Sequence, residues 1–359
     1  MNAGICLMVI ITLFVACSGL RNFRIINRFD LCMCRNADPE IYKIKVDKPN
    51  EKLDEVVAKH CSNYRTYCNH NKIAQHTIKA FDQATAFVDD FYDVTNDYEK
   101  NGKVVILDSG CGKGLSTLIL AKLYPDIPII GIDRSHDRLS RFGVYSTDGE
   151  NNDEQILVDS FVSFKGKSNA ILIRAELSDF WSLVGYQSDW VVKSHYILYP
   201  NPYPKAKHLK RRFHGHPIFP TILALGGNLI VRSNWDIYCK EMLTGIQIAF
   251  RGNQSIFPPW YKYSSLYMEK YHYNYELTDD KVSRGTYDII NRINDPMENL
   301  IRQNDLVVKN ENGANVPMTH FERKYMAIGL DIYNTVASFT TITPEQRKSL
   351  LSEMMQATK

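Results

Sequence analysis

The sequence predicts a doubly wound α/β protein with a mostly parallel sheet and helices on both faces. In the middle of the chain, short apolar runs typical of strands alternate with runs that have helical apolar spacing. The expected strands are 104–108, 127–133, 170–174, 190–198 and 228–233, and the expected helices are 115–123, 139–145, 177–184, 218–224 and 235–250. Such alternation indicates βαβ units. The 359 residues, 44% hydrophobic and 23% charged, have an ordinary globular composition that excludes a disordered or polytopic membrane protein.

The remaining segments suggest how the chain is organised. We expect a leader at 1–37, a helical N-terminal region at 38–101, the α/β domain at 102–250, an insertion at 251–310 and a C-terminal completion at 311–359. Apolar residues recur at helical spacing before residue 101, whereas 251–310 is tyrosine-rich and has no clean period. Thr343-Pro344-Glu345-Gln346 has the N-cap, N1 proline and N3 glutamine of a final helix.

The leader has a composition typical of targeting sequences. The apolar run 5–17 is too short to span a bilayer, which takes roughly 17–25 residues, but suits the core of a signal peptide. A stretch with Arg21, Arg24 and Arg28 and no acid before Asp30 follows, as in organelle transit peptides. Together they resemble the bipartite leader of secondary plastids, which predicts an organelle protein without a membrane anchor once processed. Alternatively, these residues precede the true start codon or form a loosely attached tail, and the protein is cytoplasmic. A lipid anchor at Cys17 is a weaker hypothesis.

Charge and cysteine content exclude several classes of site. The net charge of +3 is too small to indicate a partner by itself, so only clustered charge matters. The eight cysteines are spread over a long chain, four of them before residue 35, and do not form a dense disulfide framework. Cys61 and Cys68 have no second pair at zinc-site spacing. We therefore expect no metal site.

A glycine-rich turn follows the first expected strand. Asp108-Ser109-Gly110-Cys111-Gly112-Lys113-Gly114 joins that strand to a helix, and its glycines permit positive φ and close approach of a ligand. The spacing does not fit a phosphate loop, which needs Gly-Lys-Ser/Thr after four residues, or the GxGxxG of a dinucleotide site. The remaining ligand is S-adenosylmethionine, whose site in methyltransferases resembles D-x-G-x-G-x-G.

Two later acids stand where a nucleoside would need them. Asp133 ends the second strand, nineteen residues after Gly114, and a carboxylate there can accept hydrogen bonds from both ribose hydroxyls. Glu176 follows the third strand, where an adenine amino group could be bound. Glu176 is also explained as an acid favoured by a helix dipole.

A basic, proline-rich segment follows the fourth strand. Residues 198–212 read LYPNPYPKAKHLKRR, and no acid occurs between Asp189 and Asp236. The segment therefore stands at the carboxyl end of a strand, where α/β proteins bind ligands, and Lys193 and Arg232 are further cations of the acid-free stretch. Basic groups suit phosphates, and Tyr203 could stack on a base, which together favour a nucleic-acid partner.

These motifs resemble the tRNA (guanine-N7-)-methyltransferases. The family's F-P-D-P-W-P-K-K-R-H-x-K-R-R appears as YPNPYPKAKHLKRR, its T/S-D-W as Ser233-Asn234-Trp235, and its T-x-F-E as Thr319-His320-Phe321-Glu322. The resemblance covers roughly residues 103–250 and 317–330. It implies a Rossmann-like class I methyltransferase fold, S-adenosylmethionine as cofactor, and methylation of guanine N7 in tRNA, with an accessory protein subunit as a possible partner.

The resemblance also implies roles for individual residues. Asn201 takes the position of the catalytic acid. The expected cofactor contacts are Asp108, Gly110, Gly112, Gly114, Asp133 and Glu176, and the expected substrate contacts are Lys205, Lys207, Lys210, Arg211, Arg212, Asn234, Thr319 and Glu322.

Several positions depart from the family pattern. Asn201 and Asn234 replace aspartates, Tyr203 replaces tryptophan, and Asp108 stands where the family usually has glutamate. The chain is therefore expected to be a divergent member. Two other functions remain open: an exocyclic-amino methyltransferase, whose D/N/S-P-P-Y/F loop is close to Asn201-Pro202-Tyr203, and a non-catalytic RNA-binding subunit with a vestigial cofactor site.

Overall fold

The computed structural model describes residues 44, 46–95, 102–140, 155–157, 163–164, 167–252, 255–272, 286–293, 308–309 and 315–358. The expected leader at 1–37 lies outside these residues, as do most of the expected helix at 139–145 and much of 251–310. Within the described part, no helix is both long enough and apolar enough to cross a membrane.

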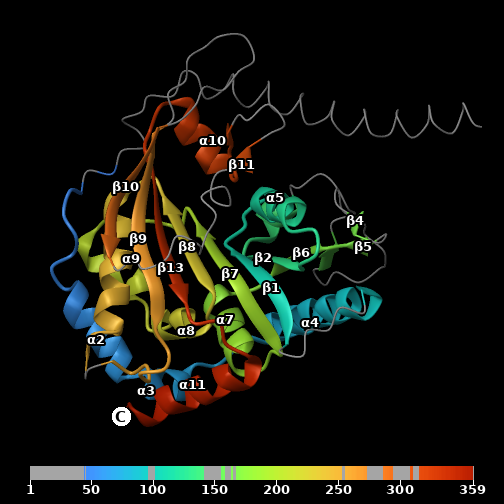
Figure 1. The fold of residues 1–359 in the computed structure, drawn as a ribbon, viewed down its shortest axis with the longest axis horizontal. Helices are drawn as coiled ribbons and strands as arrows, with labels where there is room; N and C mark the ends of the chain where they lie inside the picture. Colours follow the sequence, from blue (N-terminus) through green and yellow to red (C-terminus); the bar gives the residue numbers. More distant parts are fainter. Residues whose placement is uncertain are drawn as a thin grey trace, which may run out of the picture.

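A nine-stranded sheet forms the centre of the molecule, in the order β10-β9-β13-β8-β7-β1-β2-β6-β3 (Figure 1). Its parallel strands are β1 (Lys103–Ser109), β2 (Ile129–Asp133), β6 (Ala170–Arg174), β7 (Trp190–Leu198), β8 (Asn228–Ser233) and β9 (Tyr263–His272). The reversed strands are β3 (Gln155–Leu157), β10 (Thr286–Ile293) and β13 (Ile332–Phe339). The seven strands from β6 to β9, with only β13 reversed, make the sheet of a class I methyltransferase fold, so the predicted fold class is confirmed.

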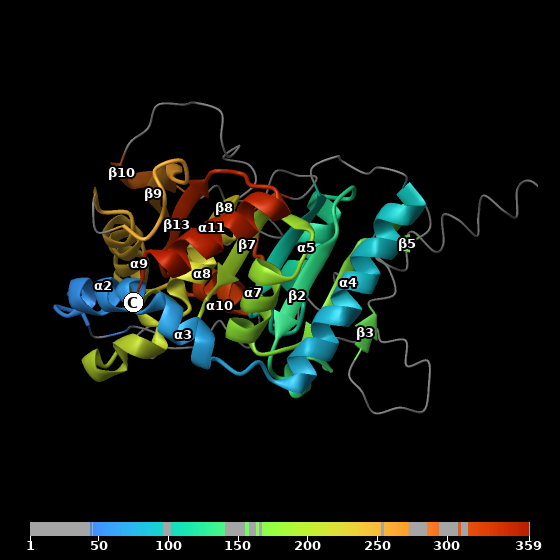
Figure 2. The same ribbon diagram turned by 90° about the horizontal axis from the view of Figure 1, so that it is seen from below.

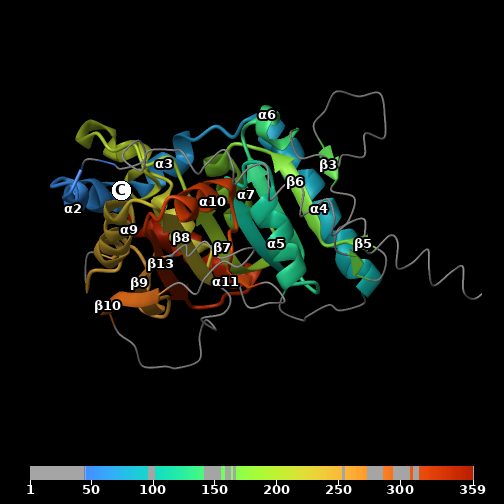
Figure 3. The same ribbon diagram turned by 90° about the horizontal axis from the view of Figure 1, so that it is seen from above.

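The helices occupy both faces, but unequally. On one face, α5 (Leu115–Leu123) contacts β2 and β6, and Leu120 packs with Ile106 and Ile129. Most other helices share a larger core with the opposite face of the strands, as Figure 3 shows from above. These are α2 (Leu53–Ser62), α3 (Tyr64–His70), α4 (Gln75–Thr95), α7 (Leu177–Tyr186), α8 (Phe219–Ala224) and α9 (Asp236–Ala249). The alternation of Val105, Ile106 and Leu107 between the two cores is that expected of a strand buried on both faces.

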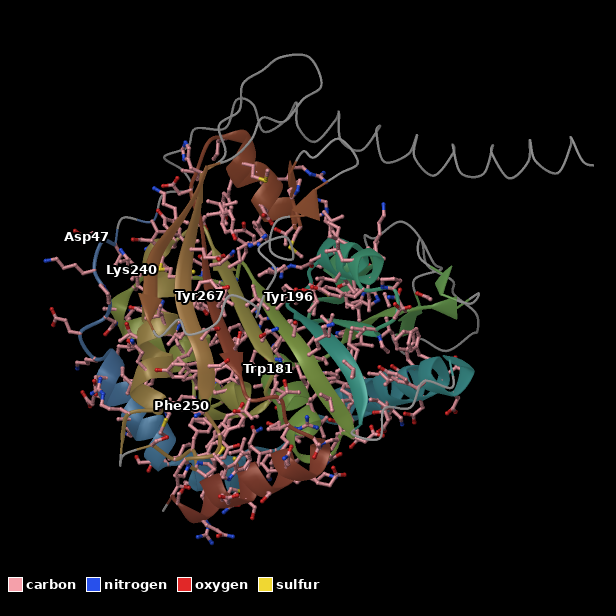
Figure 4. The ribbon with its side chains drawn as sticks, in the orientation of Figure 1. Asp47, Trp181, Tyr196, Lys240, Phe250 and Tyr267 are labelled. Carbon is pink, nitrogen blue, oxygen red and sulfur yellow. The ribbon has the colours of Figure 1, made fainter. Side chains whose placement is uncertain are left out.

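The final helix closes the edge of the sheet where the parallel strands begin. α11 (Pro344–Gln356) packs on α3, α7 and α8, and Figure 2 shows it crossing that side. Its N-terminus is the predicted capping box, in which the Thr343 hydroxyl accepts from the Gln346 N–H and the Gln346 side chain accepts from the Thr343 N–H. An aromatic cluster around Phe250 also lies toward this end of the sheet, far from α10 (His320–Ala327) at the other end (Figure 4).

Two described segments of the expected insertion at 251–310 lie in the main sheet. β9 pairs along its length with β13, and β10 pairs with β9, so these two strands extend the main sheet. The tyrosine-rich pattern hid the strand because β9 buries Leu266, Met268, Glu269 and Tyr271, a set that includes a charged residue, while its other residues are half-buried or exposed. The described chain also contains the short helix α6 (His136–Leu139) and the 3₁₀ helices η2 (Ala206–Arg211) and η3 (Phe213–Gly215). Two small two-stranded sheets pair β4 (Ser163–Phe164) with β5 (Lys167–Ser168) and β11 (Val308–Lys309) with β12 (Asn315–Val316).

The strand order fixes where a ligand can bind. From β1 the chain proceeds to β2 and β6 on one side, and then to β7 and β8 on the other. The carboxyl ends of β1 and β7 therefore flank the topological switch point, where open α/β sheets bind their ligands. The glycine turn leaves one of these strands and the proline-rich loop leaves the other.

Candidate active site

The glycine turn is shaped by its three glycines. Gly110, Gly112 and Gly114 have φ values of 79°, 61° and 80°, which favour glycine. A Cβ at Gly110 or Gly112 would meet nothing within 4 Å, whereas one at Gly114 would lie 2.5 Å from Leu172 Cδ1. Gly110 and Gly112 thus leave the backbone open to a ligand. Gly114 permits the packing of the turn on β6.

Asp108 is buried beneath the turn. Its Oδ2 accepts hydrogen bonds from the hydroxyls of Ser116 and Thr117, each at 2.6 Å, which tie β1 to the first turn of α5. Its Oδ1 is buried with no hydrogen-bond partner in the structure. Burial raises the pKa of this carboxyl to about 6. An unpaired carboxylate oxygen under an open turn is suited to a cationic or hydrogen-bond-donating ligand.

Asp133 lies beside the same turn, at the end of β2. Its Oδ2 accepts from the Gly112 N–H at 3.0 Å, and its Oδ1 accepts from the Ser135 N–H at 2.8 Å. The Arg138 guanidinium is 3.6 Å from Oδ2. Each carboxylate oxygen can accept a further hydrogen bond. Asp133 therefore combines support of the turn with the capacity to bind a pair of hydroxyls.

Glu176 completes a row of acids along three neighbouring strands. It follows β6 as the N-cap residue of α7, with a half-buried side chain that makes no capping hydrogen bond. Its N–H donates to the Thr77 hydroxyl of α4. Since β1, β2 and β6 are adjacent, the acids Asp108, Asp133 and Glu176 share one edge of the sheet, as the sequence predicted.

The proline-rich loop carries Asn201 in an exposed position. Asn201 Oδ1 accepts from the Tyr203 N–H at 3.3 Å, which closes a local turn. Tyr199 and Tyr203, on either side, have positive φ values of 52° and 43°. Such values are uncommon for bulky residues and are held only where the surroundings determine them. The backbone on both sides of Asn201 is therefore fixed by other contacts.

Arg212 supplies much of that support. Its Nε and Nη2 donate to the Tyr203 carbonyl at 3.2 and 3.1 Å, and Nη2 also donates to the Pro204 carbonyl at 3.2 Å. Its Nη1 is ion-paired with Glu241 of α9, and its guanidinium lies 5.0 Å from the centre of the Trp235 ring. Only 2% of the Arg212 side chain is exposed. The phosphate contact that the sequence predicts for Arg212 does not fit its burial, because its guanidinium holds the loop from inside.

Glu241 anchors this arrangement. It is fully buried, and besides Arg212 it accepts hydrogen bonds from His214 Nε2 at 2.9 Å and from the Asn50 N–H at 2.7 Å. Burial opposes ionisation of Glu241, but the hydrogen bonds and charges of His214 and Arg212 outweigh it and lower the pKa of Glu241. Burial lowers the pKa of His214, so Arg212 is the stable positive partner.

The other predicted cations of the loop are exposed. They lie in or next to the 3₁₀ helix η2 (Ala206–Arg211) and comprise Lys205, Lys207, Lys210 and Arg211. The guanidinium of Arg211 lies 5.7 Å from the centre of the Tyr203 ring. The pKa of His208, in the same helix, is lowered by desolvation and by repulsion from Arg211 and the neighbouring lysines. These groups form a positive surface that continues from the Asn201 loop.

The Thr319–Glu322 segment is brought to the end of β8 by a buried ion pair. Thr319 caps α10 by accepting from the Glu322 N–H at 3.0 Å. Glu322 Oε1 accepts from Arg232 Nη1 at 2.8 Å, and its Oε2 accepts from the Met318 N–H at 3.0 Å. Only 2% of the Glu322 side chain is exposed, so it is a structural group in this conformation. Asn234, half-buried, follows β8 at the same edge.

Several residues that shape the site were missed from the sequence. Among them are Glu241, Asn50 and Asn334, none of which belongs to a recognisable motif; Asn334 accepts a hydrogen bond from Arg232 Nε at 2.8 Å. Beneath the turn, Ser109 Oγ lies 2.9 Å from both His195 Nε2 and Trp181 Nε1. In the sequence, such buried hydrogen bonds were indicated only by polar residues at strand and helix positions that are otherwise apolar. No group of three metal-ligating residues occurs among the residues that the structure describes.

Comparison with known proteins supports the resemblance. Residues 102–254 match the model of a family of putative methyltransferases. These residues are therefore similar to that family over part of the chain. The matched segment starts at β1 and includes the glycine turn, the Asn201 loop and α9.

Relatives with assigned names are tRNA (guanine-N(7)-)-methyltransferases. That of Mycobacterium avium is 30% identical over 109 residues, which are 30% of this chain and 35% of the relative. That of Cytophaga hutchinsonii is 27% identical over 142 residues, 39% of this chain and 56% of the relative. The chain therefore spans between a third and about half the length of these curated relatives.

The chain is also similar to solved methyltransferase structures. An antibiotic-related methyltransferase is covered over 94% of its length by 71% of this chain, with 12% identity and a TM-score of 0.35. A putative methyltransferase from Thermoplasma acidophilum shares 12% identity over 66% of this chain and 69% of that one, with a TM-score of 0.31.

Proposed function

We propose that this protein transfers the methyl group of S-adenosylmethionine to N7 of a guanine in tRNA. The observation that carries the proposal is the convergence of two motifs at one switch point. The acid-lined glycine turn leaves β1, and the Asn201 loop leaves the neighbouring strand β7. The tRNA (guanine-N(7)-)-methyltransferase names of the relatives supply the substrate class.

The residues at the turn fit S-adenosylmethionine. The open space beside Gly110 and Gly112 admits a ligand against the backbone, and the unpartnered Oδ1 of Asp108 offers an acceptor. Asp133 would hold the ribose hydroxyls, and Glu176 the adenine amino group. When bound, the cofactor supplies an electrophilic methyl group. The protein supplies its orientation.

Methylation at N7 makes modest chemical demands on the loop. Guanine N7 carries a lone pair and no proton, so no general base is required. Asn201 can accept a hydrogen bond from the N1/N2 edge of guanine, but it cannot offset the positive charge that the ring gains. A charge-assisted hydrogen bond is about twice as strong as a neutral one. The cost relative to aspartate is therefore about 1–3 kcal/mol, or roughly 10–100-fold in rate.

Rigid placement would supply most of the rate enhancement. Arg212 fixes the carbonyls of Tyr203 and Pro204, and through them the turn that carries Asn201. Holding nucleophile and methyl group in line is an effective source of catalysis because it removes translational and rotational entropy before reaction. The exposed cations Lys205, Lys207, Lys210 and Arg211 would contact tRNA phosphates.

Two measurements separate this proposal from its alternatives. Titration calorimetry with S-adenosylmethionine tests cofactor binding, and a non-catalytic scaffold need not bind it. Methyl transfer from labelled cofactor to unmodified tRNA transcripts tests catalysis. An exocyclic-amino methyltransferase would instead yield an N-methylated amine. Import into an organelle, and dependence on an accessory subunit, stay predictions from the sequence and from the family.

A further inference from the structure

Three aromatic rings, of which two are stacked, lie together at the sheet edge beside the Asn201 loop. Tyr199, at the start of that loop, has its ring centre 6.4 Å from that of Phe321 and 5.4 Å from that of Tyr325. Phe321 and Tyr325 of α10 are 6.4 Å apart. The interplanar angle is 24° between Phe321 and Tyr325, which are stacked, whereas the Tyr199 ring is tilted by 34° and 47° against these two rings. A further flat ring could continue this stack.

Phe321 is the solvent-facing member of the stack. Its side chain is 50% exposed, whereas Tyr325 is 9% exposed and Tyr199 is half-buried. Among the described residues, the large hydrophobic side chains exposed to this degree are Leu123, Trp260 and Phe321. Of these three, Phe321 lies next to the candidate site.

The stack is held rigidly. Tyr199 donates its N–H to the Arg232 carbonyl at 2.8 Å, and Arg232 forms the buried ion pair with Glu322. Glu322 is the residue after Phe321, so one pair of charges fixes both the strand end and the helix that carries the exposed ring. A pre-ordered aromatic face loses little entropy when a ligand binds to it.

The charge around the site identifies the kind of ligand. The loop that starts at Tyr199 carries the exposed cations Lys205, Lys207, Lys210 and Arg211, and Lys324 on α10 is also exposed. A flat aromatic face with surrounding positive charge is the combination that binds unpaired bases of RNA, through stacking and phosphate contacts. We propose that Phe321 is a stacking surface for an RNA base, either the target guanine or its neighbour. This inference rests on the proposed RNA substrate but not on the position that is methylated.

Fluorescence of 2-aminopurine tests the stacking directly. The probe is a single-stranded oligoribonucleotide with one 2-aminopurine between uridines, and affinity for an unmodified tRNA transcript is measured in parallel without cofactor. Stacking on Phe321 should quench the probe. Phe321→Ala should remove most of the quenching and weaken RNA binding roughly 5–150-fold, the range that loss of one base–aromatic stack gives. Phe321→Tyr should restore both.

The matched control is Trp260→Ala, because Trp260 has similar exposure, 41%, but lies next to β9 at its first residues, away from the site. It should change neither readout, and equal melting temperatures should show that the variants are folded. Equal quenching and equal RNA affinity of wild type and Phe321→Ala would overturn the inference. If Phe321-dependent quenching occurs but no 7-methylguanosine forms, the inference stands and the proposed function fails. If wild type and Phe321→Ala form equal amounts of 7-methylguanosine and no quenching is seen, the inference fails and the proposed function stands.

Discussion

Replacing Arg212 with lysine should loosen the Asn201 loop without removing the buried positive charge. Lysine keeps the ion pair with Glu241, but its single ammonium group cannot also reach the carbonyls of Tyr203 and Pro204. Three hydrogen bonds of 3.1 to 3.2 Å are lost. Each hydrogen bond contributes about 1 kcal/mol, and water partly replaces those lost from the half-buried loop. The free energy of unfolding should therefore fall by about 2–3 kcal/mol.

Arg212→Ala should cost more. It leaves Glu241 buried without its cation, and breaking a buried pair by removing one partner costs about 3–5 kcal/mol. Urea denaturation followed by tryptophan fluorescence measures both losses, since the Trp235 ring lies against the Arg212 guanidinium. Methyl-transfer rates should fall with Arg212→Lys even under conditions where the variant is fully folded.

Arg211 is the matched control because it is the preceding residue in the chain and is exposed. Arg211→Ala should change the unfolding free energy by no more than about 0.5 kcal/mol. It should instead lower the slope of log affinity for tRNA against log salt by about 0.7–0.9, whereas Arg212→Ala should leave that slope unchanged. A loss of stability below about 0.5 kcal/mol for Arg212→Lys, or a lower salt slope for Arg212→Ala, would refute the assignment of Arg212 to the interior of the loop.

Further expected outcomes concern the cofactor, the loop and the positive surface. Asp133→Ala should weaken S-adenosylmethionine binding roughly 30–150-fold in calorimetry, because two hydrogen bonds of about 1–1.5 kcal/mol each are lost; unchanged affinity would contradict the cofactor assignment. Because burial raises the pKa of Asp108 to about 6 in the folded protein, stability should fall as pH rises through 6. Asp108→Asn should therefore be about 2–3 kcal/mol more stable than wild type in urea at pH 8 and nearly equal to it at pH 4, and an equal gain at both would contradict the raised pKa. Replacing Lys210 and Arg211 together with alanine should lower the salt slope by about 1.4–1.8, and an unchanged slope would assign them to a merely solvated surface. Asn201→Asp should keep or raise the methylation rate while Asn201→Ala lowers it roughly 10–100-fold, so a loss with Asp would count against the N7 chemistry.

The sheet was largely predictable because its central strands are apolar runs with clear ends. The expected strands at 170–174, 190–198 and 228–233 have the bounds of β6, β7 and β8. β9 and β13 were not predicted. β9 mixes buried and half-exposed residues without a regular period, and β13 contains Asn334 and Thr335, whose side chains form hydrogen bonds with residues distant in the chain. Long-range pairing of this kind leaves no local pattern in the sequence.

The candidate site was predictable where spacing carries the chemistry, as for the glycine turn and the acids Asp133 and Glu176. Charge type alone did not distinguish Arg211 from Arg212. One is exposed, while the other is buried against Glu241, which lies 29 residues later in the chain. The contact between Phe321 and Tyr199 was likewise not predictable from the sequence, since it depends on the packing of α10 against the end of β7.

The central claim is methylation of guanine N7, and nucleoside analysis of the reaction product tests it most directly. Unmodified tRNA transcripts would be incubated with the purified protein and S-adenosylmethionine, digested to nucleosides and examined by mass spectrometry, with Asp133→Ala as the inactive control. We predict 7-methylguanosine that depends on both cofactor and wild-type protein. A different methylated nucleoside, or no methylation of any transcript by protein that binds the cofactor, would contradict the claim.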